Sequence, residues 1–166
     1  MLFTKEKQKS LPPEISLLKT MTALGQNHEA VEFAKDLLEK DSHKDWILFY
    51  QGVALENEGN VQQATEQYEK SIKVNPDLAP VLVRLGQIYL QRTDAATART
   101  YLLKAAKIIK NDPGIIHSLG LVAHIEGDEK KAVKYWKKAV RIDKKYAPAF
   151  RLCRSLQYKK LQDIGF

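Results

Sequence analysis

The sequence predicts an all-α solenoid built from repeated helical hairpins. The main observation is that the chain matches itself when it is displaced by 34 residues, so that Gly52 falls on Gly86 and then on Gly120. The same displacement brings Ala64 onto Ala98. A second observation is the pair of amphipathic runs on either side of residues 58–60, which indicates two helices in each repeat. Regular self-similarity of this kind is typical of repeat architectures.

Nine helices are expected along the chain, after a polar N-terminal tail at 1–10. Proline in the first turn suits the start of the first helix at Leu11-Pro12-Pro13. Asn60, Asp94 and Asp128 precede helices as plausible N-caps. The predicted helices span 14–24, 27–40, 45–58, 61–74, 79–92, 95–109, 114–126, 129–142 and 147–162.

The small residues and the proline have expected structural roles. We expect Gly52 and Ala64 to lie where the two helices of one hairpin cross closely, because a large side chain would separate the backbones there. Gly59 stands where the first helix must end, and glycine adopts the left-handed conformation at little cost. Tyr68 is expected to fill the space beside the next hairpin, and Pro76 to mark the boundary between repeats.

The pattern resembles the tetratricopeptide repeat, whose signature runs W-x2-L-G-x2-Y…A-x3-F…A…P. Repeats 79–112 and 113–146 follow it except at the boundary proline, where Lys110 and Lys144 stand instead. Repeat 11–44 has Leu18 in place of the first glycine and Ser42 in place of the proline. The resemblance implies a right-handed superhelical α-solenoid of four helix-turn-helix repeats (11–44, 45–78, 79–112 and 113–146), closed by a capping helix and tail at 147–166. In repeat 45–78 the matching residues are Leu48, Gly52, Leu55, Gly59, Ala64, Tyr68, Ser71 and Pro76.

The composition limits the class of protein. No run of about 18 apolar residues is present, so no membrane span is predicted. The N-terminus lacks the apolar core and cleavage pattern of a signal peptide. The single Cys153 cannot form an intramolecular disulfide and suits a reducing compartment. A cytoplasmic location is therefore expected, although a fragment of a larger exported or anchored protein would have the same features.

The net charge of +7 is unevenly distributed. Between Glu129 and Lys160 there are twelve Lys and Arg residues against two acidic ones. An ordinary solvated outer face is one interpretation; a site for an acidic protein segment, anionic lipid or nucleic acid is the other. Tyr135 and Trp136 occupy core positions of the repeat, which disfavours nucleic acid. The candidate basic patch on one helix face consists of Lys130, Lys134, Lys137, Arg141 and Lys145.

The resemblance implies that the first helices of successive repeats line a concave groove in which a partner binds. Four members of one helix, Trp46, Phe49, Tyr50 and Val53, form an apolar stripe with helical spacing. The stripe is either core or an anchor for a partner, since aromatic residues often dominate interfaces. The candidate groove residues are Trp46, Phe49, Tyr50, Val53, Asn57, Val83, Arg84, Gln87, Leu90, Gln91, His117, Leu121, His124, Arg151 and Ser155.

Catalytic chemistry has little support in the sequence. His117 and His124 lie two turns apart, and no Cys or carboxylate completes a metal-ligand set around them. Cys153 has no evident His partner, and the glycines are not clustered into a phosphate-binding loop. We therefore expect no enzyme activity, metal or cofactor. The predicted function is a scaffold that binds a peptide or helix of another protein; the alternatives are a self-assembling structural scaffold and an adaptor for an acidic partner.

Overall fold

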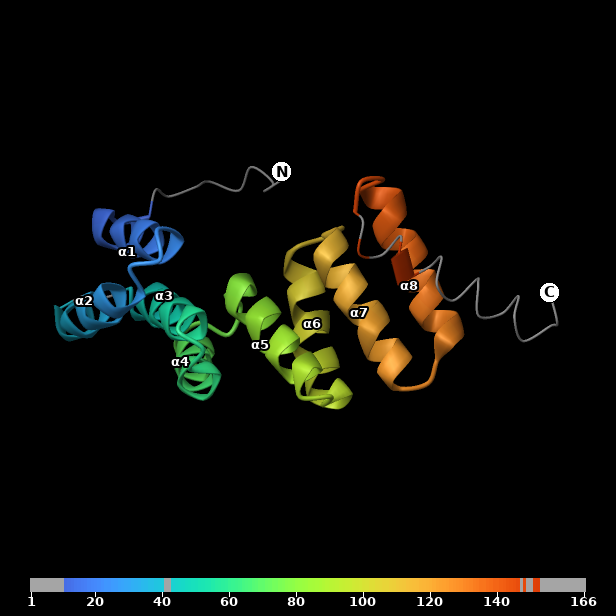
Figure 1. Cartoon of the computed structure of the whole chain (residues 1–166), viewed down its shortest axis with the longest axis horizontal. Coiled ribbons are helices and arrows are strands. Elements are labelled where there is room, and N and C mark those ends of the chain that lie inside the picture. Colours follow the sequence, from blue (N-terminus) through green and yellow to red (C-terminus); the bar gives the residue numbers. More distant parts are fainter. Residues whose placement is uncertain (1–10, 41–42, 147, 149–150, 153–166) are drawn as a thin grey trace. The chain divides into compact units, whose positions relative to one another are not determined.

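The computed structural model describes residues 11–40, 43–146, 148 and 151–152 (Figure 1). This part of the chain consists of helices and the turns between them and contains no strand. The eight helices are within one residue of the predicted limits at each end. The ninth predicted helix and the polar tail lie outside the described residues, apart from Pro148, Arg151 and Leu152. The helices are α1 (Pro13–Ala23), α2 (Asn27–Lys40), α3 (Lys44–Asn57), α4 (Val61–Val74), α5 (Ala79–Gln91), α6 (Ala95–Ile108), α7 (Pro113–Ile125) and α8 (Glu129–Ile142).

The chain divides into two compact units, Met1–Pro76 and Asp77–Phe166, here named the N-terminal and C-terminal units. In the N-terminal unit α3 contacts α1, α2 and α4. In the C-terminal unit α5 pairs with α6 and α7 pairs with α8, while α7 also contacts α5 and α6. Within each unit the helices thus pack on helices that are near in the sequence, as expected of a repeat array. None of the described helices is long and apolar enough to cross a membrane.

The repeated glycines make room for large side chains of the same hairpin. A Cβ atom on Gly52 would lie 2.5 Å from Cε1 of Tyr68, and one on Gly86 would lie 2.6 Å from Cγ of Leu102. A Cβ atom on Gly120 would overlap the indole of Trp136. The carbonyl oxygen of Ala98, the equivalent of Ala64, lies 3.5 Å from the Cβ position on Gly86, as expected where the two helices of a hairpin cross closely.

The Tyr68 side chain contacts α3, the other helix of its own hairpin, through both its ring and its hydroxyl group. The ring covers Gly52, and its hydroxyl donates a 2.7 Å hydrogen bond to the carboxylate of Glu56 on α3. The equivalent Trp136 is fully buried and donates from Nε1 to the carbonyl oxygen of His117 over 3.2 Å. A large ring at this position therefore joins the two helices of its hairpin.

The turn between the two helices of a hairpin has one backbone geometry in every repeat. Gly25, Gly59 and Gly127 have positive φ angles of 77°, 84° and 79°, as expected for glycine after a helix. Thr93 occupies the equivalent place after α5 with φ of 59°. Its amide bonds to the carbonyl oxygen of Leu90 over 3.0 Å, just as Gly59 bonds to Glu56 over 3.0 Å. The turn is thus conserved in geometry although one of its glycines is absent.

Two of the three predicted N-caps are confirmed. Asp94 accepts a 3.0 Å hydrogen bond from the Thr97 amide. Hydrogen bonds from the Thr97 side chain and from this amide lower the pKa of the Asp94 carboxyl group. Asp128 likewise accepts from the amide of Lys131 over 3.0 Å. Asn60 makes no capping bond; its side-chain amide donates instead to the Glu58 carboxylate over 3.4 Å, so that prediction was wrong.

Candidate functional site

The apolar stripe on α3 divides into buried and partly exposed residues. Phe49 and Tyr50 are each only 8% exposed, whereas Trp46 and Val53 are half-buried. The Trp46 ring stacks on Tyr50 at a centroid distance of 6.1 Å and meets Phe49 edge-on at 5.8 Å. Burial raises the pKa of the Tyr50 hydroxyl. Phe49 and Tyr50 are therefore packed in the protein interior, while Trp46 and Val53 keep a surface that a partner could contact.

Asn57, at the end of α3, is held by the N-terminal unit itself. Its side-chain amide donates to Oδ1 of Asn27 over 3.0 Å and to the carbonyl oxygen of Thr22 over 3.4 Å. These bonds join the end of α3 to the end of α1 and the start of α2. Asn57 therefore has a structural role in addition to its predicted place in the groove.

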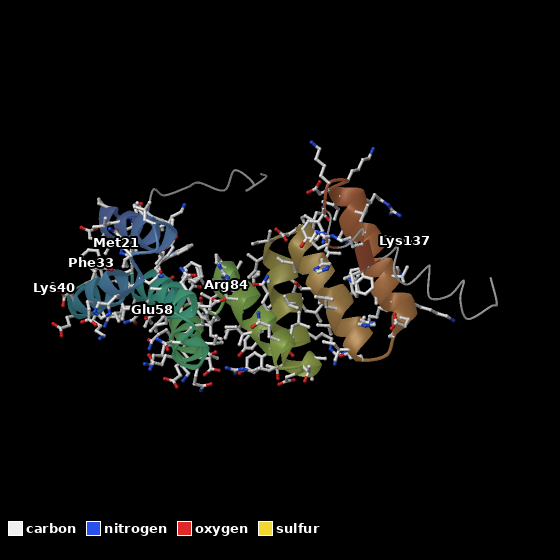
Figure 2. The ribbon with its side chains drawn as sticks, viewed as in Figure 1. Met21, Phe33, Lys40, Glu58, Arg84 and Lys137 are labelled. Carbon is white, nitrogen blue, oxygen red and sulfur yellow. The ribbon has the colours of Figure 1, made fainter. Side chains whose placement is uncertain are left out.

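In the C-terminal unit, α5 is buried on one face and open on another. Its residues Val81, Leu82, Leu85 and Ile88 are buried. Its predicted groove residues lie beside these buried residues on the helix and are half-buried or exposed. Arg84 is one of them and is labelled in Figure 2. They combine apolar and polar side chains: Val83, Arg84, Gln87, Leu90 and Gln91.

The predicted residues of α7 continue this open face. His117, Leu121 and His124 lie 34 residues after Val83, Gln87 and Leu90, on the equivalent helix of the next repeat. Because α5 and α7 are equivalent helices in contact, residues in equivalent positions lie on the same side of the stack. Leu121 and His117 are half-buried and His124 is exposed. Three predicted residues of α7 therefore occupy positions equivalent to predicted residues of α5, and the two helices are in contact in the C-terminal unit.

The two histidines of α7 have different surroundings. The His117 ring lies 5.6 Å from the ring of Tyr146, and its Nε2 atom is buried with no hydrogen-bond partner among the described residues. Burial lowers the pKa of His117. His124 is exposed, with Nδ1 2.6 Å from Oε1 of Glu129. Within the described ranges no three potential ligands cluster into a metal site.

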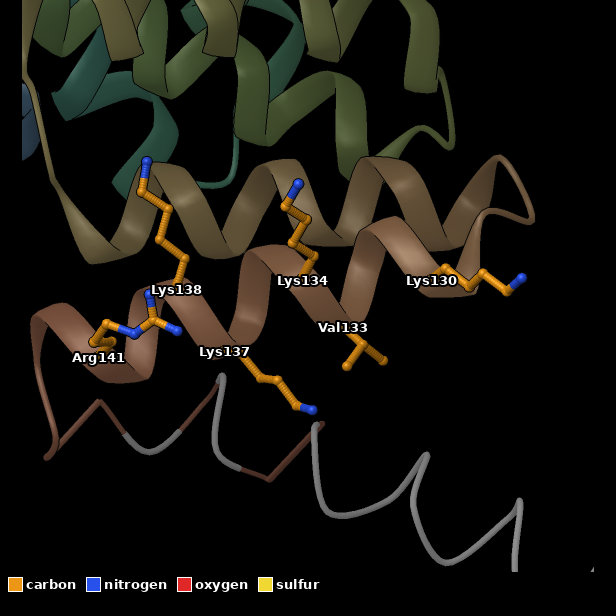
Figure 3. A pocket seen from close by; sticks show the side chains of 6 residues that line it. All are labelled: Lys130, Val133, Lys134, Lys137, Lys138 and Arg141. Carbon is orange, nitrogen blue, oxygen red and sulfur yellow. The ribbon is translucent and has the colours of Figure 1, made fainter.

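The predicted basic patch lies on α8 around a shallow hollow of about 370 Å³ (Figure 3). Four of its members, Lys130, Lys134, Lys137 and Arg141, line this hollow. The fifth, Lys145, is in the turn after the helix, where its backbone amide donates to Asp143 over 2.9 Å. The lining also includes Val133 and Lys138. Sequence reasoning missed Lys138, although its position four residues after Lys134 places both on one face.

Two remaining candidates belong to the predicted capping segment. Arg151 is exposed, and Ser155 lies outside the described residues. Leu152, between them, packs against the core cluster that includes Ile116 and Trp136. Tyr146 and Leu152 therefore cover part of the hydrophobic core of the last hairpin.

The sequence is similar to those of two characterised proteins. The chain is 28% identical over 124 residues to the anaphase-promoting complex subunit CDC16 of Saccharomyces cerevisiae, covering 71% of this chain and 14% of CDC16. It is 30% identical over 114 residues to the photosystem I assembly protein Ycf3 of Prochlorococcus marinus MIT 9211, covering 58% of this chain and 66% of Ycf3. The chain thus spans less than two thirds of the length of either relative.

Solved structures show the same fold. The structure of MamA from Desulfovibrio magneticus RS-1, from residue 41 to its end, matches with a TM-score of 0.77 at 20% identity, covering 91% of this chain and 88% of that one. The family model of the tetratricopeptide repeat matches residues 48–78, 79–112 and 113–146. These three matches span more than half of the sequence and contain the glycine and alanine series described above. The chain therefore belongs to the tetratricopeptide repeat family.

Proposed function

We propose that the protein is a non-catalytic scaffold that holds a peptide or a helix of a partner protein. The partner would lie on the open faces of the helices that come first in each hairpin. The observation that carries the proposal is the shared face of α5 and α7 in the C-terminal unit. There Leu90 and Leu121 supply apolar surface, while Gln87 and Gln91 supply amide groups that both donate and accept hydrogen bonds. Apolar contacts with polar groups around them are the usual composition of a protein interface.

The names of two relatives support this class of function. One is a subunit of a large complex and the other is an assembly protein, so both are associated with other proteins. For the present chain we propose the same general role and no particular complex. We also propose a cytoplasmic location, because a lone cysteine suits a reducing compartment.

The N-terminal unit offers a candidate contact of its own for a partner. Trp46 is half-buried and rests on Phe49 and Tyr50, so its orientation is fixed before a partner arrives. A fixed aromatic side chain loses little conformational entropy on binding, and Trp is a frequent energetic centre of interfaces. We propose Trp46 as an anchor residue, with Phe49 and Tyr50 as its support.

The proposal is tested by affinity capture from the native host with three forms of the chain. One is the wild type and one carries Gln87→Lys and Gln91→Lys, two exposed positions on the open face. The matched control carries Ala96→Lys and Thr100→Lys, two exposed positions on α6, and adds the same charge elsewhere. Circular dichroism establishes that all three are folded, and mass spectrometry identifies the captured proteins.

The expected result is a protein captured by the wild type and the α6 control and lost with the α5 variant. Quantitative binding to that protein, once purified, should then weaken by at least about tenfold in the α5 variant, the effect of losing roughly one good interfacial contact. Equal capture by all three forms would contradict the proposed surface.

A further inference from the structure

One face of α8 concentrates positive charge around a concavity. Five cationic side chains line the hollow of about 370 Å³, and Val133 is the remaining lining residue. Figure 3 shows Lys134 and Lys138 projecting to one side of the helix and Val133 and Lys137 to the other. The opposite face of α8 is fixed in the core through Ala132, Trp136 and Ala139, so the helix cannot rotate to spread this charge.

The cations of the hollow lack acidic neighbours. Among the described residues, none of the five is within ion-pair distance of a carboxylate. The nearby acids are engaged elsewhere: Glu129 contacts His124 at 2.6 Å, Asp128 caps the helix and Asp143 accepts from the Lys145 amide. Within the described part of the chain, the charge of these five side chains is therefore left for a ligand or counterions to neutralise.

We propose that this face of α8 binds an acidic, Asp- or Glu-rich segment of a partner protein, as a site separate from the open face of α5 and α7. Lys130 and Arg141 mark the ends of the hollow and are eleven residues apart. At 1.5 Å per residue this is about 16 Å along the helix, which matches roughly five residues of extended chain. Such a segment can place several carboxylates between Lys134 and Lys138 on one side of the helix and Lys137 on the other.

The lining favours a polypeptide over other polyanions. Single-stranded nucleic acid needs aromatic side chains for base stacking, whereas Tyr135 and Trp136 of α8 pack in the core cluster. Helices that lie on anionic membranes insert a broad apolar face rich in Trp, Phe and Leu, and here Val133 alone lines the hollow with an apolar side chain. A single valine among lysines instead suits the methylene groups of a glutamate side chain.

The proposed complex should be weak and sensitive to salt. All five cations are exposed, and exposed ion pairs contribute little individually. Affinity must therefore come from several pairs formed at once, and increasing ionic strength will screen them. Charge complementarity of this type mainly accelerates association and selects the partner.

The test measures binding of a fluorescein-labelled hexaglutamate peptide to the full chain by anisotropy, at low and high salt. The site variant carries Lys134→Glu, Lys137→Glu and Lys138→Glu. The control carries Lys104→Glu, Lys107→Glu and Lys110→Glu, three exposed residues on or just after α6, and has the same net charge. The site variant should bind at least about tenfold more weakly than wild type, and the control within about twofold.

Two results would overturn the inference. Equal weakening in both variants would show that net charge, and not the hollow, attracts the peptide. Tighter binding of duplex DNA or phosphatidylserine vesicles than of peptide, lost in the site variant only, would assign the face to another class of ligand. The Gln87→Lys, Gln91→Lys variant should bind the peptide at least as well as wild type, so failure of the groove proposal leaves this inference intact.

Discussion

At the scale of single residues, Gly120 and Trp136 show the tightest packing found at any of the described glycines. Trp136 is fully buried, and its indole occupies the space that a side chain on residue 120 would need. The indole cannot move away easily, because its Nε1 donates to the carbonyl oxygen of His117. This position therefore tolerates no atom beyond the glycine hydrogens.

We expect Gly120→Ala to lower the free energy of unfolding by about 2 kcal/mol. Overpacking a core costs up to about 3 kcal/mol, and the better helix propensity of alanine offsets about 1 kcal/mol of this. Gly114→Ala in the same helix is the matched control, because its Cβ would lie 3.1 Å from Oδ1 of Asp112 and 3.6 Å from the Tyr146 hydroxyl, farther than the Trp136 atoms at Gly120. Urea denaturation measures both; an equal effect of the two substitutions would contradict the packing argument.

His117 makes stability depend on pH in a defined direction. Its folded-state pKa is depressed by burial below the usual 6.5, so in the range below 6.5 the unfolded state binds more protons than the folded state. The free energy of unfolding should therefore fall as the pH drops through this range. His117→Gln should flatten the dependence of stability on pH, measured by urea denaturation across that range.

The positions of the glycines could be predicted from the sequence, but their neighbours could not. A repeat of 34 residues fixes which helix face each glycine occupies. Which side chain reaches it depends on the length and direction of that side chain, and the sequence pattern did not indicate that Tyr68 extends back over Gly52. Similarly, Trp46 and Phe49 belong to one stripe in the sequence, and only the neighbouring helices determine that Phe49 is buried and Trp46 partly exposed.

At the scale of the helix and its turn, the loop between α5 and α6 contains an unfavourable residue. Thr93 adopts φ of 59°, a conformation that is costly for a β-branched side chain. Hydrogen bonds of the turn impose it, including the bond from the Asp94 amide to the Tyr89 carbonyl oxygen at 2.9 Å. The strain is therefore maintained by the ends of the two helices it connects.

We expect Thr93→Gly to raise the free energy of unfolding by about 0.5–1 kcal/mol. Relief of the left-handed conformation gains about 1–2 kcal/mol, and the larger entropy of glycine in the unfolded chain removes part of it. Thermal unfolding followed by circular dichroism measures the change. The reciprocal substitution Gly127→Thr, at φ of 79°, should destabilise the protein; a stabilising effect there would refute the explanation.

Helix limits were the most predictable feature at this scale. Strong turn sequences and regular apolar spacing gave the ends of α2, α4 and α8 without error. Capping was less predictable, since Asn60 and Asp94 stand at equivalent positions and only the aspartate caps its helix. The amide of Asn60 instead bonds to Glu58, a local competitor that the residue type does not reveal.

At the scale of the whole molecule, the described contacts join helices that are near in the sequence. Stability in such a chain is approximately a sum of local terms and nearest-neighbour terms. Gly120→Ala should therefore accelerate amide hydrogen exchange in α7 and α8 much more than in α1 to α4. Native-state exchange read by mass spectrometry provides the measurement. Uniform acceleration along the chain would show that it unfolds as one cooperative body.

The placement of the two tryptophans has a practical consequence for such experiments. The chain has only two, Trp46 in the N-terminal unit and Trp136 in the C-terminal unit. Trp136 is sealed from water while Trp46 is half-buried, so their fluorescence spectra should differ in wavelength. Each unit thus contains one intrinsic fluorophore. Replacing one tryptophan by phenylalanine would allow the thermal unfolding of the other unit to be followed by itself.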